Sequence, residues 1–470
     1  MSHTQSTAIR SLQVSDAKGD AFAPILVHCH LRWDFVWQRP QQIFSRLARH
    51  HRILFLEDPI DGEGQPRLLI TAPQSNIVRV VPVLPGCGAT MSVDQQSEAT
   101  LGLLEQALMT HPLLKAQFIN PIQWFYSPMS AKVFMDKFDA IAVVYDCMDE
   151  LANFKFAPAD LGQREDALIA RADIVFTGGH QLFKAKSQCH GNTHFFGCGV
   201  DAAHFGRARL EGTRIPDDLA RLTGPVIGYF GVIDERLDYD LIACLAERFA
   251  SGSVVMVGPL AKVSPDDLPK HSNIHWMGQR AYTDLPNIVK AFDVCIMPFA
   301  LNAATEFINP TKTLEYMAAG KPIVSTAIRD VVRNFTPVVK VAYSHEEFAE
   351  GVEAALAGKL GMSLPQLDLL AKGVERAAGA TWDVTVSNMR ALMLQSVESS
   401  LQPINSGRIP ALFKPLPIKT RADWNVADTA VMQLAGGAAR VRDMMFWWLV
   451  PAFRVRSWRS NSHPVACLCW

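Results

Sequence analysis

The chain has 470 residues, of which 49% are hydrophobic and 19% are charged, and its formal net charge is −1. This length exceeds one ordinary hydrophobic core, so we expect two domains with additional segments. The balanced charge gives no support for a nucleic-acid partner. The nine cysteines have neither CxxC pairs nor zinc spacing, which favours reduced thiols in a cytoplasmic protein and no bound metal.

The first predicted strand covers Ile25–Cys29 and follows a polar stretch, residues 1–23, that we interpret as a flexible leader. A helix is predicted from Pro40, so the loop between strand and helix lies at the carboxyl edge of a sheet, where ligands bind. The alternative is that the tryptophans of this loop belong to the core and its cations to the surface. The loop carries three basic candidates for ligand contacts: His30, Arg32 and Arg39.

A later predicted strand, Ala140–Tyr145, is followed by Asp146, Asp149 and Glu150. Three carboxylates at the end of a strand are difficult to explain as a solvated surface, and such clusters have perturbed pKa values. Asp146 or Asp149 is therefore a candidate for stabilising positive charge or accepting a proton. A metal site and helix capping by Asp149 are the alternatives, although the spacing D-x-x-D-E differs from the D-x-D of metal-dependent transferases.

Three later strands lead into loops that combine glycine with a basic side chain, which suits close approach of backbone to an anion. The first of these loops, residues 178–180, is equally explained as a turn. The second precedes a predicted helix start near Asp238 but lacks the G-x-G-x-x-G of a dinucleotide site. The candidate ligand contacts in the three loops are His180, Gly231, Arg236, Gly278 and Arg280.

Residues 294–326 are expected to form strand, loop, helix and strand, with Asn309 as N-cap and Pro310 as first helical residue. Free N–H groups and the dipole at such a helix start favour an anion, phosphate above all. Lys312 in the first turn opposes the dipole unless a phosphate lies between them, and Glu315 shares its face. The alternative is an ordinary surface ion pair between Lys312 and Glu315.

The helix sequence EYMAAGKP (315–322) resembles the E-x-x-A-x-G-x-P donor-binding signature of retaining, two-domain (GT-B) glycosyltransferases of group 1, also called family 4. The run WQRPQ (37–41) resembles the N-terminal signature of a bacterial subgroup typified by teichuronic-acid-biosynthesis enzymes. The resemblance covers roughly residues 24–395. Two features depart from it: Glu306 and Glu315 have eight residues between them, one more than the usual pair, and the lysine that often follows Arg236 is missing.

This resemblance implies an α/β protein of GT-B architecture, with two Rossmann-like, doubly wound parallel-sheet domains, an interdomain cleft and a C-terminal extension. The implied segments are an N-terminal acceptor-side domain at 24–205, a linker at 206–223, a nucleotide-sugar-binding domain at 224–382, a helix at 383–400 that crosses back to the first domain, and a tail at 401–470.

The resemblance also implies an enzyme that moves a sugar, without a cofactor, from a nucleoside diphosphate-sugar to a glycan or lipid-linked acceptor in polysaccharide biosynthesis. Glu315 would hold the ribose hydroxyls and Glu306 the sugar, unless Glu306 is merely solvated. A sugar-nucleotide epimerase of similar fold and a non-catalytic sugar-nucleotide-binding scaffold at the membrane are the alternatives. From the residues and the resemblance together, the predicted catalytic residues are Asp146, Asp149 and Glu306; the predicted acceptor side carries His30, Arg32, Arg39 and His180; the predicted donor-binding residues are Gly231, Arg236, Gly278, Arg280, Asn309, Pro310, Thr311, Lys312, Thr313 and Glu315.

The tail at 401–470 lies outside this resemblance. Its four prolines between 403 and 417 predict an extended linker, and residues 444–453 form an aromatic segment flanked by arginines. That segment is too short and too proline-broken to span a bilayer. It suits peripheral contact with the anionic inner face of the cell membrane. The alternative is that it packs on the protein or forms an oligomer contact.

Overall fold

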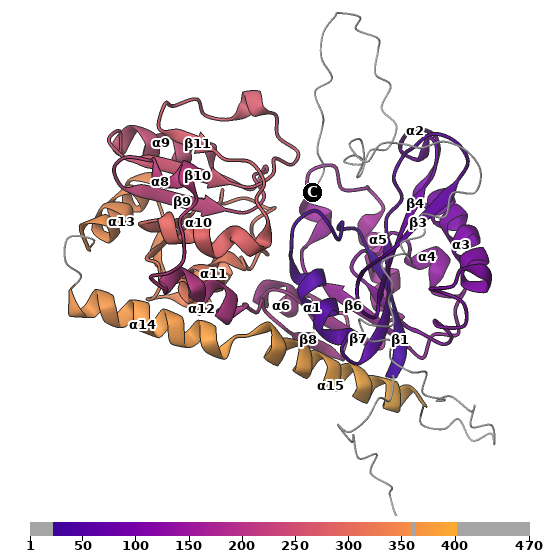
Figure 1. The fold of residues 1–470 in the computed structure, drawn as a ribbon. Helices are drawn as coiled ribbons and strands as arrows, with labels where there is room; N and C mark the ends of the chain where they lie inside the picture. The colour runs from indigo at the N-terminus through magenta and orange to yellow at the C-terminus, as the bar shows by residue number, and fades with distance from the viewer. Residues whose placement is uncertain (1–21, 359–362, 402–470) are drawn as a thin grey trace, which may run out of the picture.

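Two α/β domains lie side by side in the computed structural model, which describes residues 22–358 and 363–401 (Figure 1). The N-terminal domain is built on an eight-stranded sheet and the C-terminal domain on a six-stranded sheet. This architecture confirms the predicted fold class. The predicted membrane-contacting segment lies outside the described residues, as do residues 1–21 of the predicted leader.

The N-terminal sheet has the strand order β3-β4-β2-β1-β5-β6-β7-β8, and every neighbouring pair is parallel except β3 with β4. Strand β1 starts at Phe22, opposite His51 of β2, so the predicted leader at 1–23 extends two residues too far. Two apolar clusters enclose the sheet, which explains the continuous apolar runs of its central strands. The strands are β1 (Phe22–Cys29), β2 (His51–Glu57), β3 (Arg67–Gln74), β4 (Ile77–Val83), β5 (Ile122–Phe125), β6 (Ala142–Cys147), β7 (Ile174–Thr177) and β8 (Thr193–Phe195); the helices are α1 (Arg39–Leu47), α2 (Cys87–Thr90), α3 (Val93–Thr110), α4 (Ala131–Phe134), η1 (Leu151–Asn153), α5 (Leu161–Ile169) and α6 (His180–Lys186).

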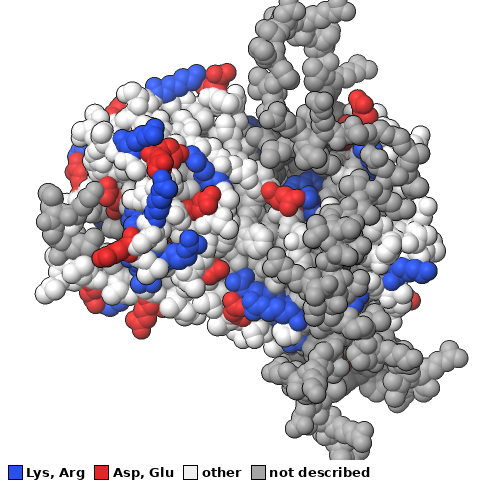
Figure 2. All heavy atoms as spheres, viewed as in Figure 1, with Lys and Arg blue, Asp and Glu red and all other residues white. Residues whose placement is uncertain are grey.

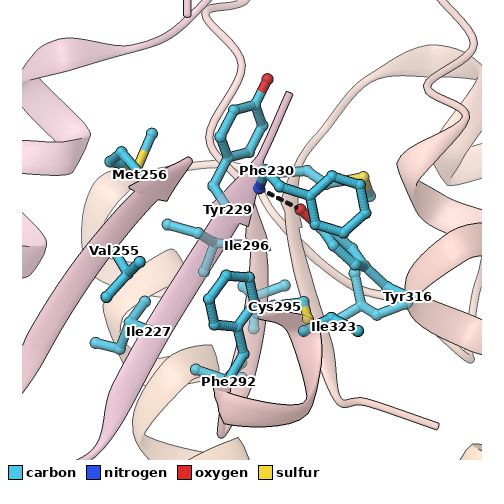
Figure 3. Packing of buried hydrophobic residues seen from close by; sticks show 14 of the residues in the cluster. Ile227, Tyr229, Phe230, Val255, Met256, Phe292, Cys295, Ile296, Tyr316 and Ile323 are labelled. Carbon is cyan, nitrogen blue, oxygen red and sulfur yellow. Dashed lines mark hydrogen bonds between the residues drawn. The ribbon is translucent and has the colours of Figure 1, made fainter. Parts of the chain in front are cut away.

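The C-terminal sheet is entirely parallel, with the strand order β11-β10-β9-β12-β13-β14. The order reverses between β9 and β12, and the loops after these two strands diverge to leave a crevice, where sheets of this type bind ligands. Figure 3 shows the core beneath that point, where Ile227, Val255 and Ile296 of three strands pack near Phe292. The strands are β9 (Val226–Phe230), β10 (Ser253–Val257), β11 (Ile274–Trp276), β12 (Val294–Met297), β13 (Ile323–Thr326) and β14 (Lys340–Ala342); the helices are α9 (Tyr239–Arg248), η3 (Pro265–Asp267), η4 (Tyr282–Asp284), α10 (Leu285–Ala291), α11 (Lys312–Ala318), α12 (Arg329–Phe335) and α13 (His345–Ala357).

Two segments join the domains. The first holds α7 (Ala202–Gly206), η2 (Arg207–Arg209) and α8 (Asp217–Ala220), so the region predicted as a linker at 206–223 contains short helices. The second runs from α14 (Leu364–Gly379) into α15 (Trp382–Leu401), which lies along the N-terminal domain (Figure 1). Apolar side chains of α15 are buried in the same cluster as β1 and β5 of that domain, which anchors the helix there.

Helix α11 starts later than predicted. Its N-cap position is Thr311, which has helical backbone angles and makes no side-chain capping bond. The predicted cap, Asn309, instead donates from Nδ2 to the carbonyl of Gly178 in the other domain, at 3.1 Å. Pro310 lies in the turn that precedes the helix. The predicted start is therefore wrong, because an interdomain contact uses the Asn309 carboxamide.

Acidic and basic side chains are interspersed on the face of the molecule shown in Figure 2, and neither sign forms a broad patch on its described residues. This distribution agrees with the near-zero net charge of the chain. None of the described helices is long and apolar enough to cross a lipid bilayer.

Candidate active site

A cavity of about 430 Å³ lies between the two domains, at the carboxyl ends of both sheets. The N-terminal domain contributes the loop after β1, the loop after β6 and two glycine-containing loops. The C-terminal domain contributes the loops after β9, β10, β11 and β12 and the first turns of α11. The lining includes Trp33, Trp37, Arg39, Gln42, Asp149, Gly178 and Cys198 from the N-terminal domain, and Gly231, Arg236, Arg280, Tyr282, Asn309, Pro310, Thr311, Lys312 and Glu315 from the C-terminal domain.

Gly231 and Lys312 lie against each other at the point where the strand order reverses. Gly231 follows β9 with φ +146°, and a Cβ atom there would lie 2.0 Å from Cε and 2.5 Å from Nζ of Lys312. Only glycine leaves room for the lysine and accepts this backbone conformation readily. The predicted glycine turn and the predicted cation therefore belong to one feature of the cavity.

Lys312 and Glu315 face the cavity from one side of α11 without pairing to each other. The Nζ of Lys312 lies 5.4 Å from the ring centre of Tyr229, and it has no ion pair in the part of the chain that the structure describes. Burial lowers the pKa of Lys312, partly offset by Glu315. Burial raises the pKa of Glu315 to about 7, partly offset by Lys312. The alternative of a surface ion pair is wrong.

Tyr316 fixes α11 against the end of β9. Its hydroxyl accepts a hydrogen bond from the backbone N–H of Phe230 at 3.1 Å, drawn as the dashed line in Figure 3. The two rings meet edge to face with centres 5.0 Å apart. Because Phe230 directly precedes Gly231, this contact sets the distance between the glycine turn and the lysine.

Arg236 is held beside the cavity by an aspartate that the sequence did not single out. Its guanidinium donates to both carboxylate oxygens of Asp234, at 2.6 to 3.1 Å. Asp234 is buried, and Arg236 also lies 5.6 Å from the ring centre of Phe154 in the other domain. A cation oriented in this way keeps a fixed position for a bound anion.

Asp149 is the predicted carboxylate that reaches the cavity. Burial raises its pKa to about 6; Arg236 lowers it, while Asp234 raises it further. Helix capping does not explain this residue, because the short helix η1 follows Glu150, whose side chain pairs with Lys186 at 2.9 Å. No three His, Cys, Asp or Glu side chains of the described residues are grouped as metal ligands would be.

Asp146 is buried away from the cavity, contrary to its predicted direct role. It accepts three hydrogen bonds from Arg39, at 2.8 to 3.1 Å, and Arg39 also donates to the Phe196 carbonyl at 2.8 Å. The sequence predicted the end of β6 at Tyr145, whereas the strand continues to Cys147 and keeps Asp146 inside the sheet. Asp146 therefore positions Arg39, which does line the cavity.

Three further predicted residues do not line the cavity. Glu306 pairs with the exposed Arg329 at 2.8 Å, in line with the alternative of a solvent-facing side chain. Thr313 is fully buried and donates to the sulfur of Met297 at 3.4 Å, because it points from α11 into the sheet. Gly278 uses its carbonyl to accept from the backbone N–H of a neighbouring loop.

The predicted acceptor side is only partly brought together. His30 is buried, and burial lowers its pKa to about 3, so its ring is neutral. Arg32 bonds to Glu57 at 3.3 Å and to the backbone of the next loop, which makes it a structural side chain. His180 donates its backbone N–H to Asp330. Of this set, Arg39 alone lines the cavity.

Sequence reasoning missed a contact that crosses the cavity. Gln42 of α1 donates to the hydroxyl of Tyr282 at 3.0 Å, and the ring centre of Trp37 lies 6.0 Å from that of Tyr282. Gln42 and Tyr282 come from different domains and are 240 positions apart, so no local pattern in the sequence predicts their contact. Trp33 belongs to the N-terminal core, as the alternative for this loop states, and it also reaches the cavity. The other part of that alternative, cations at the surface, is wrong for His30 and Arg39, which are buried.

The chain has the GT-B fold, and residues 224–358 match the family described as glycosyl transferases group 1. The matched region is the C-terminal domain, which contributes Gly231, Lys312 and Glu315 to the cavity.

Individual proteins similar to this chain are glycosyltransferases or share its fold. The curated protein TuaH of Bacillus subtilis (strain 168), whose name describes it as a glycosyltransferase of teichuronic acid biosynthesis, is 27% identical over 213 residues, which are 42% of this chain and 53% of that protein. The chain thus matches about half the length of this relative. Sucrose-phosphate synthase from Thermosynechococcus elongatus has TM-score 0.57 at 14% identity, over 80% of this chain and 100% of the other. Anabaena Alr3699/HepE in complex with UDP and glucose has TM-score 0.56 at 15% identity, over 80% and 100%. At such identities these two likenesses show the fold alone.

Proposed function

We propose that this protein transfers a sugar from a nucleoside diphosphate-sugar to a glycan or lipid-linked acceptor. The observation that carries the proposal is the arrangement of Gly231, Lys312 and Glu315 at the cavity. A half-buried cation and a half-buried carboxylate, neither paired with the other, suit a diphosphate and the hydroxyls of the attached ribose. A protein of the same fold, at 15% identity, was solved with UDP and glucose, so the fold can hold a donor of the proposed class.

The leaving diphosphate gains negative charge as the bond to the sugar breaks, and the proposal assigns Lys312 and Arg236 to meet that charge. Arg236 is already oriented by Asp234, so little reorganisation is needed during the reaction. Glu315 accepts hydrogen bonds from the ribose. Exclusion of water between the domains protects the donor from hydrolysis.

The acceptor enters from the N-terminal half of the cavity, beside Trp37 and Arg39. Asp149 faces the same space, and its pKa of about 6 suits a group that exchanges a proton near neutral pH. We assign to Asp149 the acceptance of the acceptor's proton or the stabilisation of positive charge on the sugar. Asp146 acts through Arg39.

A bacterial polysaccharide pathway is the proposed setting, supported by the likeness to TuaH. Retention of anomeric configuration, the cytoplasmic location at the inner face of the membrane and the peripheral membrane contact of the tail stay predictions.

The test is a panel of nucleoside diphosphate-sugars, incubated with the full chain, with and without glycan and lipid-linked acceptors, with release of the nucleoside diphosphate as the readout. Release that requires an acceptor supports transfer, and NMR of the product then reports its anomeric configuration. Interconversion of the donor alone would indicate an epimerase. Tight donor binding with no turnover under any condition would indicate a non-catalytic scaffold.

A further inference from the structure

The Gly178–His180 loop meets the C-terminal domain more closely than any side chain at its centre would allow. A Cβ atom on Gly179 would lie 2.8 Å from the backbone oxygen of Phe307 and 3.1 Å from Oδ2 of Asp330. Gly179 itself has φ −129° and ψ 156°, an extended conformation that any residue adopts. The glycine is therefore required by the other domain and not by its own backbone.

Asp330 caps a helix of the opposite domain. Helix α6 follows Gly179, which has no side chain to cap it, and the backbone N–H of His180 donates to Oδ2 of Asp330 at 2.7 Å. Asp330 is buried and belongs to α12, which lies beside α6 in Figure 1. A carboxylate at a helix N-terminus is stabilised by the unpaired N–H groups and the dipole.

The same contact reaches the segment that leads into α11. Asn309 donates to the carbonyl of Gly178, and the thiol of Cys198 donates to the carbonyl of Asn309 at 3.4 Å. Gly178 in turn lies against the backbone of Met148, the residue before Asp149, with its added Cβ only 2.9 Å from that carbonyl oxygen. One interdomain contact thus touches both the donor-side helix start and the loop of Asp149.

We infer that Gly179 and Asp330 are positioning residues: they permit the two domains to close on each other and thereby place Asp149 opposite Lys312 and Glu315. Neither residue lines the cavity, so neither needs to touch substrate. The catalytic consequence rests on the proposed transfer reaction, whereas the closure itself does not.

The decisive variant is Gly179→Ala in the full chain, with Gly191→Ala as its matched control. Gly191 lies in the exposed turn before β8, and an added Cβ there meets nothing within 4 Å. Hydrogen–deuterium exchange, followed without ligand, reports the His180 amide. In Gly179→Ala that amide is expected to exchange about tenfold faster than in the wild type, with an unchanged or slightly higher Tm. The control should match the wild type in both. Equal exchange in Gly179→Ala and wild type would overturn the inference.

Substitution of Asp330 tests the hydrogen bond to His180 without adding a side chain at Gly179. Asp330→Asn keeps an oxygen that can accept from His180 and should retain most of the amide protection, whereas Asp330→Ala should lose it. Asp383→Ala is the control, because Asp383 also makes ion pairs, with Arg46 and Arg49 of the N-terminal domain. If Asp330→Ala leaves the His180 amide fully protected, Asp330 does not hold the contact.

Turnover gives the second readout. Once a donor and acceptor are found, Gly179→Ala should lower kcat about tenfold or more with a smaller change in the KM of the donor, since the C-terminal domain still binds it. Absence of any turnover in the wild type would count against the proposed function and leave the exchange result to decide closure.

Discussion

At the cavity lie two pairs of charged side chains, one from each domain, that are arranged in opposite ways. In the N-terminal domain, Arg39 and Asp146 form a buried pair with three hydrogen bonds, and the arginine also satisfies a backbone carbonyl. In the C-terminal domain, Lys312 and Glu315 face the cavity without pairing to each other, and burial shifts the pKa of each towards its neutral form. In the first arrangement both charges are satisfied by protein groups, whereas in the second the two charges are not paired with each other.

This difference separates a structural charge from one that awaits a ligand. Breaking a buried, hydrogen-bonded pair leaves a charge that the interior cannot solvate, so the cost appears in stability. Removing a desolvated charge that has no protein partner relieves the fold, so the cost appears in binding or catalysis. A substitution at either pair should therefore affect mainly stability or mainly binding and catalysis, and measuring both quantities distinguishes the two kinds of charge.

The largest effect is expected for Asp146→Ala, which leaves the guanidinium of Arg39 buried without its carboxylate. The free energy of unfolding should fall by about 3–5 kcal/mol, measured by urea denaturation of the full chain. The double variant Asp146→Ala with Arg39→Leu should be clearly more stable than the sum of the two single changes predicts, because the stranded charge is gone. A loss below about 1 kcal/mol for Asp146→Ala would show that the pair is not structural.

The next effect is expected for Lys312→Met, which keeps the length of the side chain and removes its charge. Stability should be unchanged or slightly raised, because burial already disfavours the charged amine. If Lys312 neutralises the leaving diphosphate, kcat/KM for transfer should fall by about 10²–10³. Lys270→Met, at an exposed position, is the control. Full activity in Lys312→Met would show that Lys312 does not neutralise the diphosphate.

A smaller effect, with a pH signature, is expected for Glu315→Gln. Donor affinity should fall by about 10- to 100-fold at pH 8, measured by calorimetry. Because burial raises the pKa of Glu315 to about 7, wild-type affinity should increase as the pH rises through 7 and the carboxylate ionises.

Stability should change in the opposite direction. The folded protein holds the proton of Glu315 more tightly than the unfolded chain, so the stability linked to this group is complete below about pH 4.5 and lost as the pH rises through about 7. Glu315→Gln removes that dependence. If Glu315→Gln and the wild type show the same stability and the same donor affinity at every pH in this range, the assigned site is contradicted.

Most of the residues that the sequence predicted for the C-terminal side do line the cavity, because local chemistry places them there. A strand followed by Gly231, and a strand, loop and helix with Lys312 and Glu315 in its first turns, bring these residues to one edge of a parallel sheet. The fold class followed from the same strand and helix alternation together with the family resemblance.

The rest of the site depends on facts that spacing does not encode. Asp146 and Asp149 both follow the apolar run at 140–145 and look alike in sequence, but strand β6 continues to Cys147 and turns Asp146 into the interior. The contacts of Gln42 with Tyr282 and of Asn309 with Gly178 join residues 240 and 131 positions apart. Such pairs form only when the two domains meet, so no single segment predicts them.

The smallest effect is expected at Glu306, which the family resemblance predicts to contact the sugar but which pairs with exposed Arg329. An exposed ion pair contributes at most about 1 kcal/mol, so Glu306→Gln and Arg329→Gln should each change stability by less than that and kcat/KM by no more than about threefold. The two variants test different ideas, because only Glu306 matches the family signature. If Glu306→Gln alone lowers kcat/KM more than tenfold, the loop before α11 must move toward the cavity when donor binds, and Arg329 then holds Glu306 away from it in the free protein.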